Sequence, residues 1–143
     1  MNDQNREKVF PARLDQLEPV QEFVGQALAQ YGCPPKIRFQ IDVSIEEIFV
    51  NIVRYAYPPE QQGEAVIRCG VGGEPLQVTV QFVDRGKPFN PLEKQDADIT
   101  LSAEERGIGG LGILMVKKSM DTVDYRYENG ENILTLTKIL PAL

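Results

Sequence analysis

The segment Glu104–Lys118, EERGIGGLGILMVKK, joins a cluster of glycines to an apolar helical pattern, and the rest of the chain is interpreted outward from it. Four of the six residues from 107 to 112 are glycine. Glycine tolerates positive φ and allows a ligand close to the backbone. The start of a helix offers unpaired N–H groups and partial positive charge, which favour phosphate. Two interpretations follow from this segment alone: a loop that wraps phosphates, or a hinge before a core helix.

The residues after the glycines predict a helix. Leu111, Leu114 and Met115 fall at helical spacing, and Ile113 and Val116 widen this apolar stripe. We therefore expect the stripe to face the core.

Three of the glycines also fit the dinucleotide-binding pattern G-x-G-x-x-G: Gly107, Gly109 and Gly112. That pattern requires a strand directly before it and an acidic residue about twenty positions later. The preceding residues 101–106, LSAEER, are polar and favour a helix instead. A Rossmann domain is therefore rejected.

The composition predicts one globular domain spanning residues 1–143, since 42% of the residues are apolar. No apolar run has the length of a membrane span, and the N-terminal residues contain no signal peptide, so a cytoplasmic protein is expected. A formal charge of −6 argues against direct nucleic-acid binding. Cys33 and Cys69 match no zinc or redox spacing and are expected to be free thiols.

Histidine is absent from the sequence. This excludes a Ser-His-Asp triad, a histidine zinc site and a phospho-acceptor histidine on this chain. A general base here must be a carboxylate or, less readily, a lysine.

Periodicity predicts an α+β fold with the element order β-α-α-β-β-loop-α-β-β, in which helices cover one face of a mixed or largely antiparallel sheet. Asp15 is expected to cap the first helix. Strands are expected over 7–12, 63–71, 76–83, 123–127 and 133–139, with helices over 15–31, 35–57 and the residues after the glycines. The segment 90–106 is long and acidic, which indicates a functional lid or a mobile insert.

The helix predicted over 35–57 carries two rows of interest. Its core row consists of Ile41, Ile45, Ile48, Ile52 and Tyr55. On a second row, Glu47 and Asn51 stand one turn apart and could hold a hard cation or its water shell through oxygen atoms. The alternative is that they belong, with Glu46, to the solvated face.

Asp84-Arg85-Gly86 follows a predicted strand. A carboxylate at a strand end can accept a hydrogen bond from a ligand, and a glycine two residues later lets the backbone approach closely. The alternative is an ordinary turn, for which Asp-x-Gly is common.

Taken in order, these three motifs resemble the N, G1 and G2 boxes of the GHKL ATP-binding superfamily. The motif-bearing part, about residues 35–140, looks closest to the anti-sigma factor serine/threonine kinase branch. The supporting segments are YAYP at 55–58, DRGKPFNP at 84–91, Met120-Asp121 and NIL at 132–134. One departure is Tyr55, where family members often carry histidine.

This resemblance implies a two-layer α/β sandwich that binds ATP or ADP with Mg²⁺. Asn51 would bind the Mg²⁺, Asp84 would accept a hydrogen bond from the adenine amino group, and Gly86 would give room for the base. Glu47 would be the catalytic base, and Arg106 would contact the γ-phosphate. The residues implied to wrap the phosphates are Gly107, Gly109, Gly110 and Gly112.

The function implied is that of an ATP-dependent serine/threonine kinase and anti-sigma factor. It would phosphorylate a serine on an anti-anti-sigma partner of the STAS type, sequester a sigma factor and form a homodimer. A nucleotide-binding regulatory module that holds a partner without phosphorylating it stays open, because both would use the same pocket. The catalytic half of a split histidine kinase is disfavoured by the absence of histidine.

Overall fold

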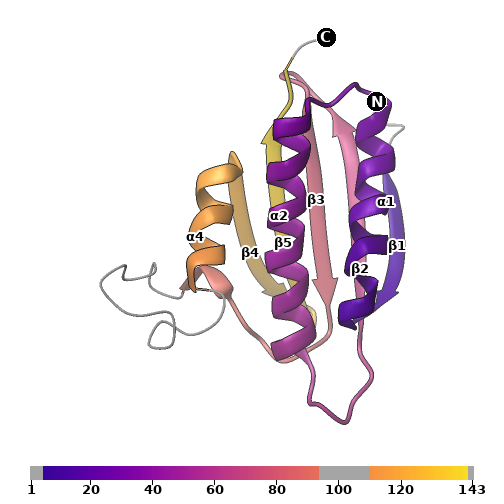
Figure 1. Ribbon diagram of the computed structural model, residues 1–143. Coiled ribbons are helices and arrows are strands. Elements are labelled where there is room, and N and C mark those ends of the chain that lie inside the picture. The colour runs from indigo at the N-terminus through magenta and orange to yellow at the C-terminus, as the bar shows by residue number, and fades with distance from the viewer. Residues whose placement is uncertain (1–4, 94–109, 142–143) are drawn as a thin grey trace.

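The computed structural model describes residues 5–93 and 110–141, which form two layers (Figure 1). One layer is a five-stranded sheet in the order β1-β2-β3-β5-β4, and every neighbouring pair of strands is antiparallel. The three long helices lie on the same face of this sheet. The predicted α+β sandwich is confirmed, and of the two expected sheet types the described strands form the antiparallel one.

The elements follow the predicted order. The strands are β1 (Arg6–Pro11), β2 (Glu64–Gly72), β3 (Gln77–Asp84), β4 (Thr122–Glu128) and β5 (Glu131–Ile139). The long helices are α1 (Leu17–Ala29), α2 (Pro35–Asn51) and α4 (Gly110–Ser119). Three short helical segments are η1 (Leu14–Gln16), η2 (Ile52–Ala56) and η3 (Pro91–Glu93).

The start of α1 differs from the prediction. Gln16, not Asp15, precedes its first residue, and no side chain caps it. Asp15 lies within the 3₁₀ turn η1, where its carboxylate pairs with Arg13 at 3.2 Å. The tight turn places Asp15 one residue too early to reach the free N–H groups of α1. The buried apolar residues of α1 include Val20, Val24, Ala27 and Leu28, whereas Leu17 is partly exposed.

The helix predicted over 35–57 changes character near its end. It is α-helical as far as Asn51 and continues as the π-helix η2. The predicted isoleucine row is buried from Ile41 to Ile52, and the half-buried Tyr55 packs against Phe89 with ring centroids 5.6 Å apart. A π-turn widens the helix by one residue and often occurs where a helix borders a functional site.

The apolar stripe predicted for α4 is confirmed at Ile113 and Val116 and wrong at Met115. Ile113, Val116 and Met120 are buried, whereas Met115 is 50% exposed. An unbroken apolar run fits more than one helical face, so the sequence alone could not choose between them. Packing of α4 against α2 and β4 makes the choice.

The hairpin between β4 and β5 turns at residues 129 and 130. Asn129 and Gly130 both have positive φ, 54° and 77°. This geometry matches the twist of paired strands and favours Asn-Gly. It sets Glu128 opposite Glu131 and brings β5 back beside β4.

No described helix covers the other face of the sheet. A polar row crosses four strands there: Arg68 lies 3.5 Å from Glu7 and donates to Gln81 at 3.0 Å, and Gln81 donates to Thr135 at 3.1 Å. The adjacent row on the same face is apolar and consists of Val9, Val66, Val83 and Ile133.

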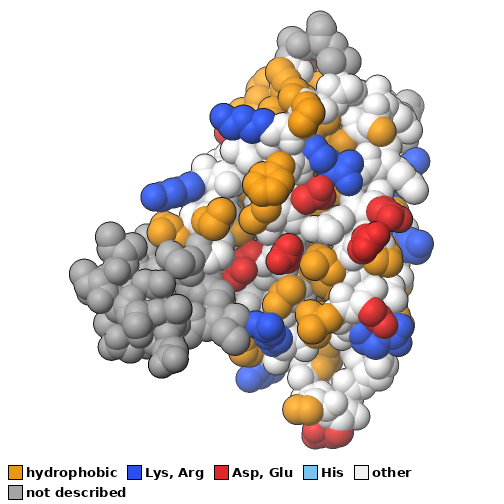
Figure 2. All heavy atoms as spheres, in the orientation of Figure 1, with side chains coloured by type: hydrophobic (Ala, Val, Ile, Leu, Met, Phe, Trp, Pro, Cys, Tyr) orange, Lys and Arg blue, Asp and Glu red, His pale blue; other side chains and the backbone are white. Residues whose placement is uncertain are grey.

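The helix-bearing face carries acidic and basic side chains interspersed with exposed hydrophobic ones (Figure 2). Among the described side chains of α2 and α4, the large exposed hydrophobic ones are Phe39 and Met115. None of the helices in the described ranges is both long and apolar enough to cross a lipid bilayer.

Truncation of a central β5 residue tests the core. Leu136 is fully buried between Val80 and Val123, so Leu136→Ala is expected to lower the free energy of unfolding by about 2–5 kcal/mol. Ile139 on the same strand is 44% exposed, and Ile139→Ala is expected to cost less than about 1 kcal/mol. Urea unfolding of both variants measures the difference. Equal losses would contradict this account of the core.

Candidate functional site

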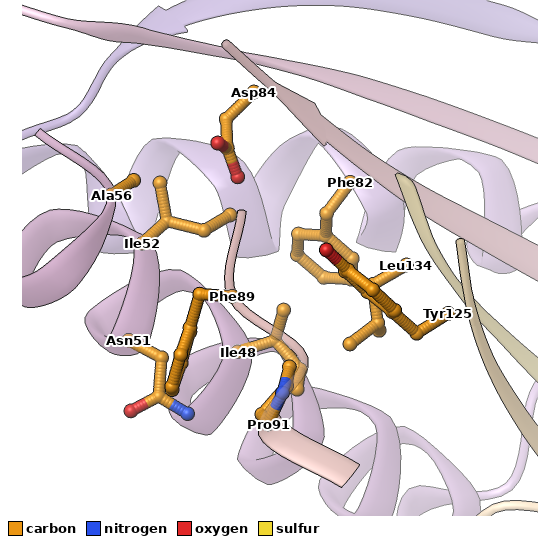
Figure 3. A pocket seen from close by; sticks show the side chains of 10 residues that line it. All are labelled: Ile48, Asn51, Ile52, Ala56, Phe82, Asp84, Phe89, Pro91, Tyr125 and Leu134. Atoms are coloured by element: carbon orange, nitrogen blue, oxygen red, sulfur yellow. The ribbon is translucent and has the colours of Figure 1, made fainter. Parts of the chain in front are cut away.

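A pocket lies between the C-terminal end of α2 and the ends of β3, β4 and β5 (Figure 3). It encloses about 390 Å³ of empty space, its open mouth included. Its walls are mainly apolar, and the polar side chains among them are those of Asn51, Asp84 and Tyr125. The apolar members are Ile48, Ile52, Ala56, Phe82, Phe89, Pro91 and Leu134. A few polar groups in an apolar cleft are typical of small-molecule sites.

Asp84, the last residue of β3, is 6% exposed and turns its carboxylate toward the pocket (Figure 3). Its Oδ1 accepts hydrogen bonds from the Gly86 N–H and from Asn132 Nδ2, both at 2.9 Å. None of the described residues donates to Oδ2. Burial raises the pKa of Asp84, and the two hydrogen bonds oppose that rise. One oxygen is therefore fixed by the protein, while the other is left for a ligand.

The geometry of Asp84 is compatible with both interpretations of Asp-x-Gly, the turn and the ligand contact. The contact from Gly86 N to Asp84 Oδ1 is the turn that the sequence allowed as the simpler alternative. Because that turn uses only Oδ1, it does not compete with a ligand for Oδ2.

Gly86 also meets a backbone requirement that the sequence did not indicate. A Cβ at this position would lie 2.1 Å from the carbonyl oxygen of Ala56, at the end of η2. The next residue, Lys87, donates its N–H to the same oxygen at 2.9 Å. Glycine therefore lets the segment after β3 join the end of η2 directly.

Asn51 and Glu47 occupy different surroundings, although they stand one turn apart on α2. Asn51 is buried and lines the pocket, so the solvated-face alternative does not hold for it. Glu47 is half-buried outside the pocket lining, while its neighbour Glu46 is exposed.

The Glu47 carboxylate lies directly against the first turn of α4. A Cβ on Gly112 would be 2.0 Å from Glu47 Oε2. Gly112 thus allows the close approach of the glycine-rich segment and the acidic residue of α2. The structure brings together two of the three sequence motifs at this point.

The glycine-rich segment is described only in part. Gly110 is the first residue of α4, and Gly112 lies in its first turn. Arg106, Gly107 and Gly109 lie outside the described residues, as does most of the predicted lid segment.

Asn132 on β5 is a site residue that the sequence analysis quoted only within the segment 132–134 and gave no role. It is buried, and its carboxamide contacts Asp84, the 86–89 segment and the Tyr125 hydroxyl. The available signal was its parity, since Asn132 shares the inward-facing positions of β5 with Leu134 and Leu136.

Tyr57, quoted from the sequence only within the segment 55–58 and given no role there, connects three segments. Its hydroxyl donates to the Glu64 carbonyl at 2.6 Å and accepts from the Arg85 N–H at 3.0 Å. Its ring covers Gly63, where a Cβ would lie 2.1 Å from the ring. Burial raises the pKa of Tyr57, so the hydroxyl stays neutral and holds the start of β2 near the end of β3.

Within the described ranges, no group of three or more His, Cys, Asp or Glu side chains could hold a metal ion. Of the donors proposed from the sequence, Asn51 supplies an amide oxygen in the pocket. A cation here would therefore have to share its coordination with oxygen atoms of a ligand.

Comparison with known proteins gives consistent matches. Residues 10–138 match the model of the histidine kinase-like ATPase domain. The chain is 29% identical over 104 residues to the serine-protein kinase RsbW of Listeria monocytogenes, matching 70% of this chain and 64% of that protein. It is 29% identical over 130 residues to RsbW of Bacillus licheniformis, matching 83% and 79%.

A second kinase and a solved structure extend these matches. The serine/threonine-protein kinase BtrW of Bordetella bronchiseptica is 26% identical over 102 residues, 71% of this chain and 70% of that one. The crystal structure of the RsbU and RsbW domains of Rv1364c from Mycobacterium tuberculosis superposes with a TM-score of 0.68 at 19% identity. The superposition covers 96% of this chain and 33% of that one, and it confirms the fold. The chain belongs to the histidine kinase-like ATPase domain family, and the relatives it matches are serine and serine/threonine protein kinases of the RsbW and BtrW type.

Proposed function

We propose that this chain is a protein serine/threonine kinase that uses Mg-ATP and acts as an anti-sigma regulator. The observation that carries the proposal is the Asp84 carboxylate, with one oxygen held by the protein and the other left in an apolar pocket. The family match and the kinase relatives support the same reaction.

The adenine base is placed against Asp84. Phe82, Phe89 and Leu134 supply apolar surface for a flat ring. Asp84 Oδ2 accepts a hydrogen bond from the exocyclic amine. Guanine has a carbonyl oxygen at the corresponding ring carbon, which would face the carboxylate without a shared proton. The site therefore selects adenine over guanine, because bound guanine would leave the buried acceptor Asp84 Oδ2 without a hydrogen bond.

The phosphates are placed toward the first turn of α4. The helix start at Gly110 provides N–H groups and a partial positive charge. We propose that Gly107 and Gly109, which lie outside the described residues, also bind the phosphates. Asn51 would hold Mg²⁺ through its amide oxygen, and the phosphates would supply further oxygen ligands. Arg106 contacts the γ-phosphate. The bound cation neutralises phosphate charge during transfer.

Glu47 is the proposed general base. As a partner serine oxygen bonds to the γ-phosphorus, its hydroxyl proton passes to Glu47, and the bond from phosphorus to the bridging oxygen of ADP breaks. The chain has no histidine, so a carboxylate is the natural base. The packing of Glu47 against Gly112 supports this role, because Gly112 belongs to the turn proposed to bind the phosphates.

The partners follow the same resemblance. We propose that the accepting serine lies on an anti-anti-sigma protein of the STAS type, that the chain also sequesters a sigma factor, and that it acts as a cytoplasmic homodimer. The names of the matched kinases support serine as the acceptor.

Thermal unfolding tests nucleotide binding. At a hundredfold excess over its dissociation constant, Mg-ADP or Mg-ATP stabilises a protein by about 2.7 kcal/mol. This should raise the midpoint by roughly 5–10 °C for a domain of this size. Asn51→Ala and Asp84→Asn are expected to lose the shift, and Thr135→Ala, on the opposite face of the sheet, is expected to keep it. A nucleotide-free wild-type protein with no shift would contradict the proposed function.

Asp84→Asn also separates a ligand-binding role from a structural one. Burial raises the pKa of folded Asp84 above its ordinary value of 3.8, so its contribution to stability is lost as the pH rises through the folded pKa. An amide can keep both hydrogen bonds to Oδ1 without this loss. In urea unfolding without nucleotide, the stability of Asp84→Asn relative to wild type should therefore be higher at pH 7.5 than at pH 4.5. The opposite trend would indicate that the ionised carboxylate stabilises the fold.

Replacement of Glu47 tests the base. Glu47→Gln keeps the shape of the side chain but accepts no proton, so it should bind ATP normally and lose roughly 10²–10⁴-fold in phosphotransfer. The matched control is Glu46→Gln, since Glu46 is exposed one residue earlier. Transfer from γ-labelled ATP to candidate STAS-domain proteins measures the rate.

Three outcomes of this assay are distinct. Loss of transfer in Glu47→Gln alone supports the base assignment. Unchanged transfer in that variant excludes it. A wild-type protein that binds ATP but transfers no phosphate to any partner would instead be the non-catalytic regulatory module.

A further inference from the structure

The carboxamide of Asn132 uses its full hydrogen-bonding capacity inside the protein. Its Nδ2 donates to Asp84 Oδ1 and to the Lys87 carbonyl, both at 2.9 Å. Its Oδ1 accepts from the Phe89 N–H at 3.1 Å and from the Tyr125 hydroxyl. Two donors and two acceptor positions are all that an asparagine side chain offers. A buried amide whose donors and acceptors are all satisfied is held in one arrangement.

Only one orientation of this amide satisfies its neighbours. Exchanging its oxygen and nitrogen would place the amide oxygen against the carboxylate of Asp84 and the carbonyl of Lys87. It would also turn the NH₂ group toward the Phe89 N–H. The neighbours of Asn132 therefore determine which atom faces Asp84.

Asn132 links segments that are distant in sequence. Through Asp84 it holds the end of β3, through Lys87 and Phe89 it holds the segment after β3, and through Tyr125 it holds β4. Asp84, Phe89 and Tyr125 all line the pocket, whereas Asn132 does not. Asn132 thus acts on the pocket through the residues that form it.

We propose that Asn132 is a positioning residue for adenine recognition: its amide occupies Asp84 Oδ1, so that Oδ2 stays directed at the amino group of the base while Phe89 is held at the pocket wall. This inference rests on the proposed function, since it assigns a role in binding the same nucleotide. We therefore expect Asn132 to influence the protonation state of Asp84. Only in the ionised carboxylate are both oxygens free of a proton, so that Oδ1 can accept from Asn132 while Oδ2 accepts from the base.

The electrostatics of the site agree with this role. Burial raises the pKa of Asp84, and the side-chain hydrogen bond from Asn132 is the first of the opposing effects. Removing it leaves burial less opposed, so the pKa should rise further. Among the described residues, the titratable or charged groups near Asp84 include Tyr57, Tyr125, Glu64 and the ion pair of Arg85 with Glu131. Among these, Tyr57 stays neutral and the charges of Arg85 and Glu131 offset one another.

The experiment uses three variants of the full chain. Asn132→Ala removes the whole amide. Tyr125→Phe is the milder second variant, because it removes only the hydroxyl that donates to Asn132 Oδ1. The control is Thr135→Ala, on the same strand but facing away from the helices, which loses one hydrogen bond from Gln81 and does not line the pocket.

Two measurements are made on each variant. Carbon-13 NMR titration of the nucleotide-free protein gives the pKa of the Asp84 carboxyl. Calorimetry with Mg-ADP between pH 5.5 and pH 8.5 gives the affinity and its dependence on pH. In Asn132→Ala we expect a higher pKa of Asp84, about tenfold weaker Mg-ADP binding at pH 7, and a further loss of affinity as the pH falls. Tyr125→Phe should change both in the same direction by less, and Thr135→Ala should change neither.

The outcomes separate this inference from the proposed function. An unchanged pKa of Asp84 in both Asn132→Ala and Tyr125→Phe would overturn the inference even if wild type binds Mg-ADP. A weaker affinity that is equal at every pH would also overturn it, because a merely structural loss would act that way. If wild-type protein binds no nucleotide, the proposed function fails and the inference fails with it, whatever the NMR titration gives.

Discussion

The arrangement of the site depends on one backbone contact, between the end of η2 and the segment after β3. Lys87 donates its N–H to the Ala56 carbonyl at 2.9 Å, and Gly86 is the residue that allows the two chains to come this close. This contact joins the helix that carries Asn51 to the strand that carries Asp84, so both side chains line one pocket. A larger residue at position 86 would have to displace backbone atoms, which do not yield as a flexible side chain does.

Around this contact, Asp84, Glu47 and Asn132 occupy different positions relative to the pocket. Asp84 gives one oxygen to the protein and keeps the other, Glu47 lies outside the pocket beside Gly112, and Asn132 acts from behind the pocket wall. A buried carboxylate is costly for the folded chain, and such costs persist where a ligand is to be bound. The wide π-turn of η2, which follows Asn51 directly, lies at the same place.

The sequence predicted the parts that depend on regular periodicity. Alternation located all five strands to within two residues at each end, the isoleucine row located the buried side of α2, and motif order brought Asn51 and Asp84 to one pocket. The remaining features depend on tertiary packing. The face of α4 is chosen by its neighbours, because an unbroken apolar run fits several phases. The role of Asn132 depends on partners on β3, β4 and the following segment, and local sequence does not specify these contacts.

The two side-chain rows on the helix-free face have a consequence for strand alignment. A slip of one residue would turn a whole strand over and is penalised in any half-buried sheet. A slip of two residues keeps each side chain on its own face, so the core alone opposes it less. Here it would set the valine row of Val9, Val66 and Val83 against Glu7, Arg68 and Gln81, breaking the polar chain while exposing apolar surface. Neighbouring polar and apolar rows therefore disfavour two-residue shifts in strand register, which the alternation of side chains alone does not prevent.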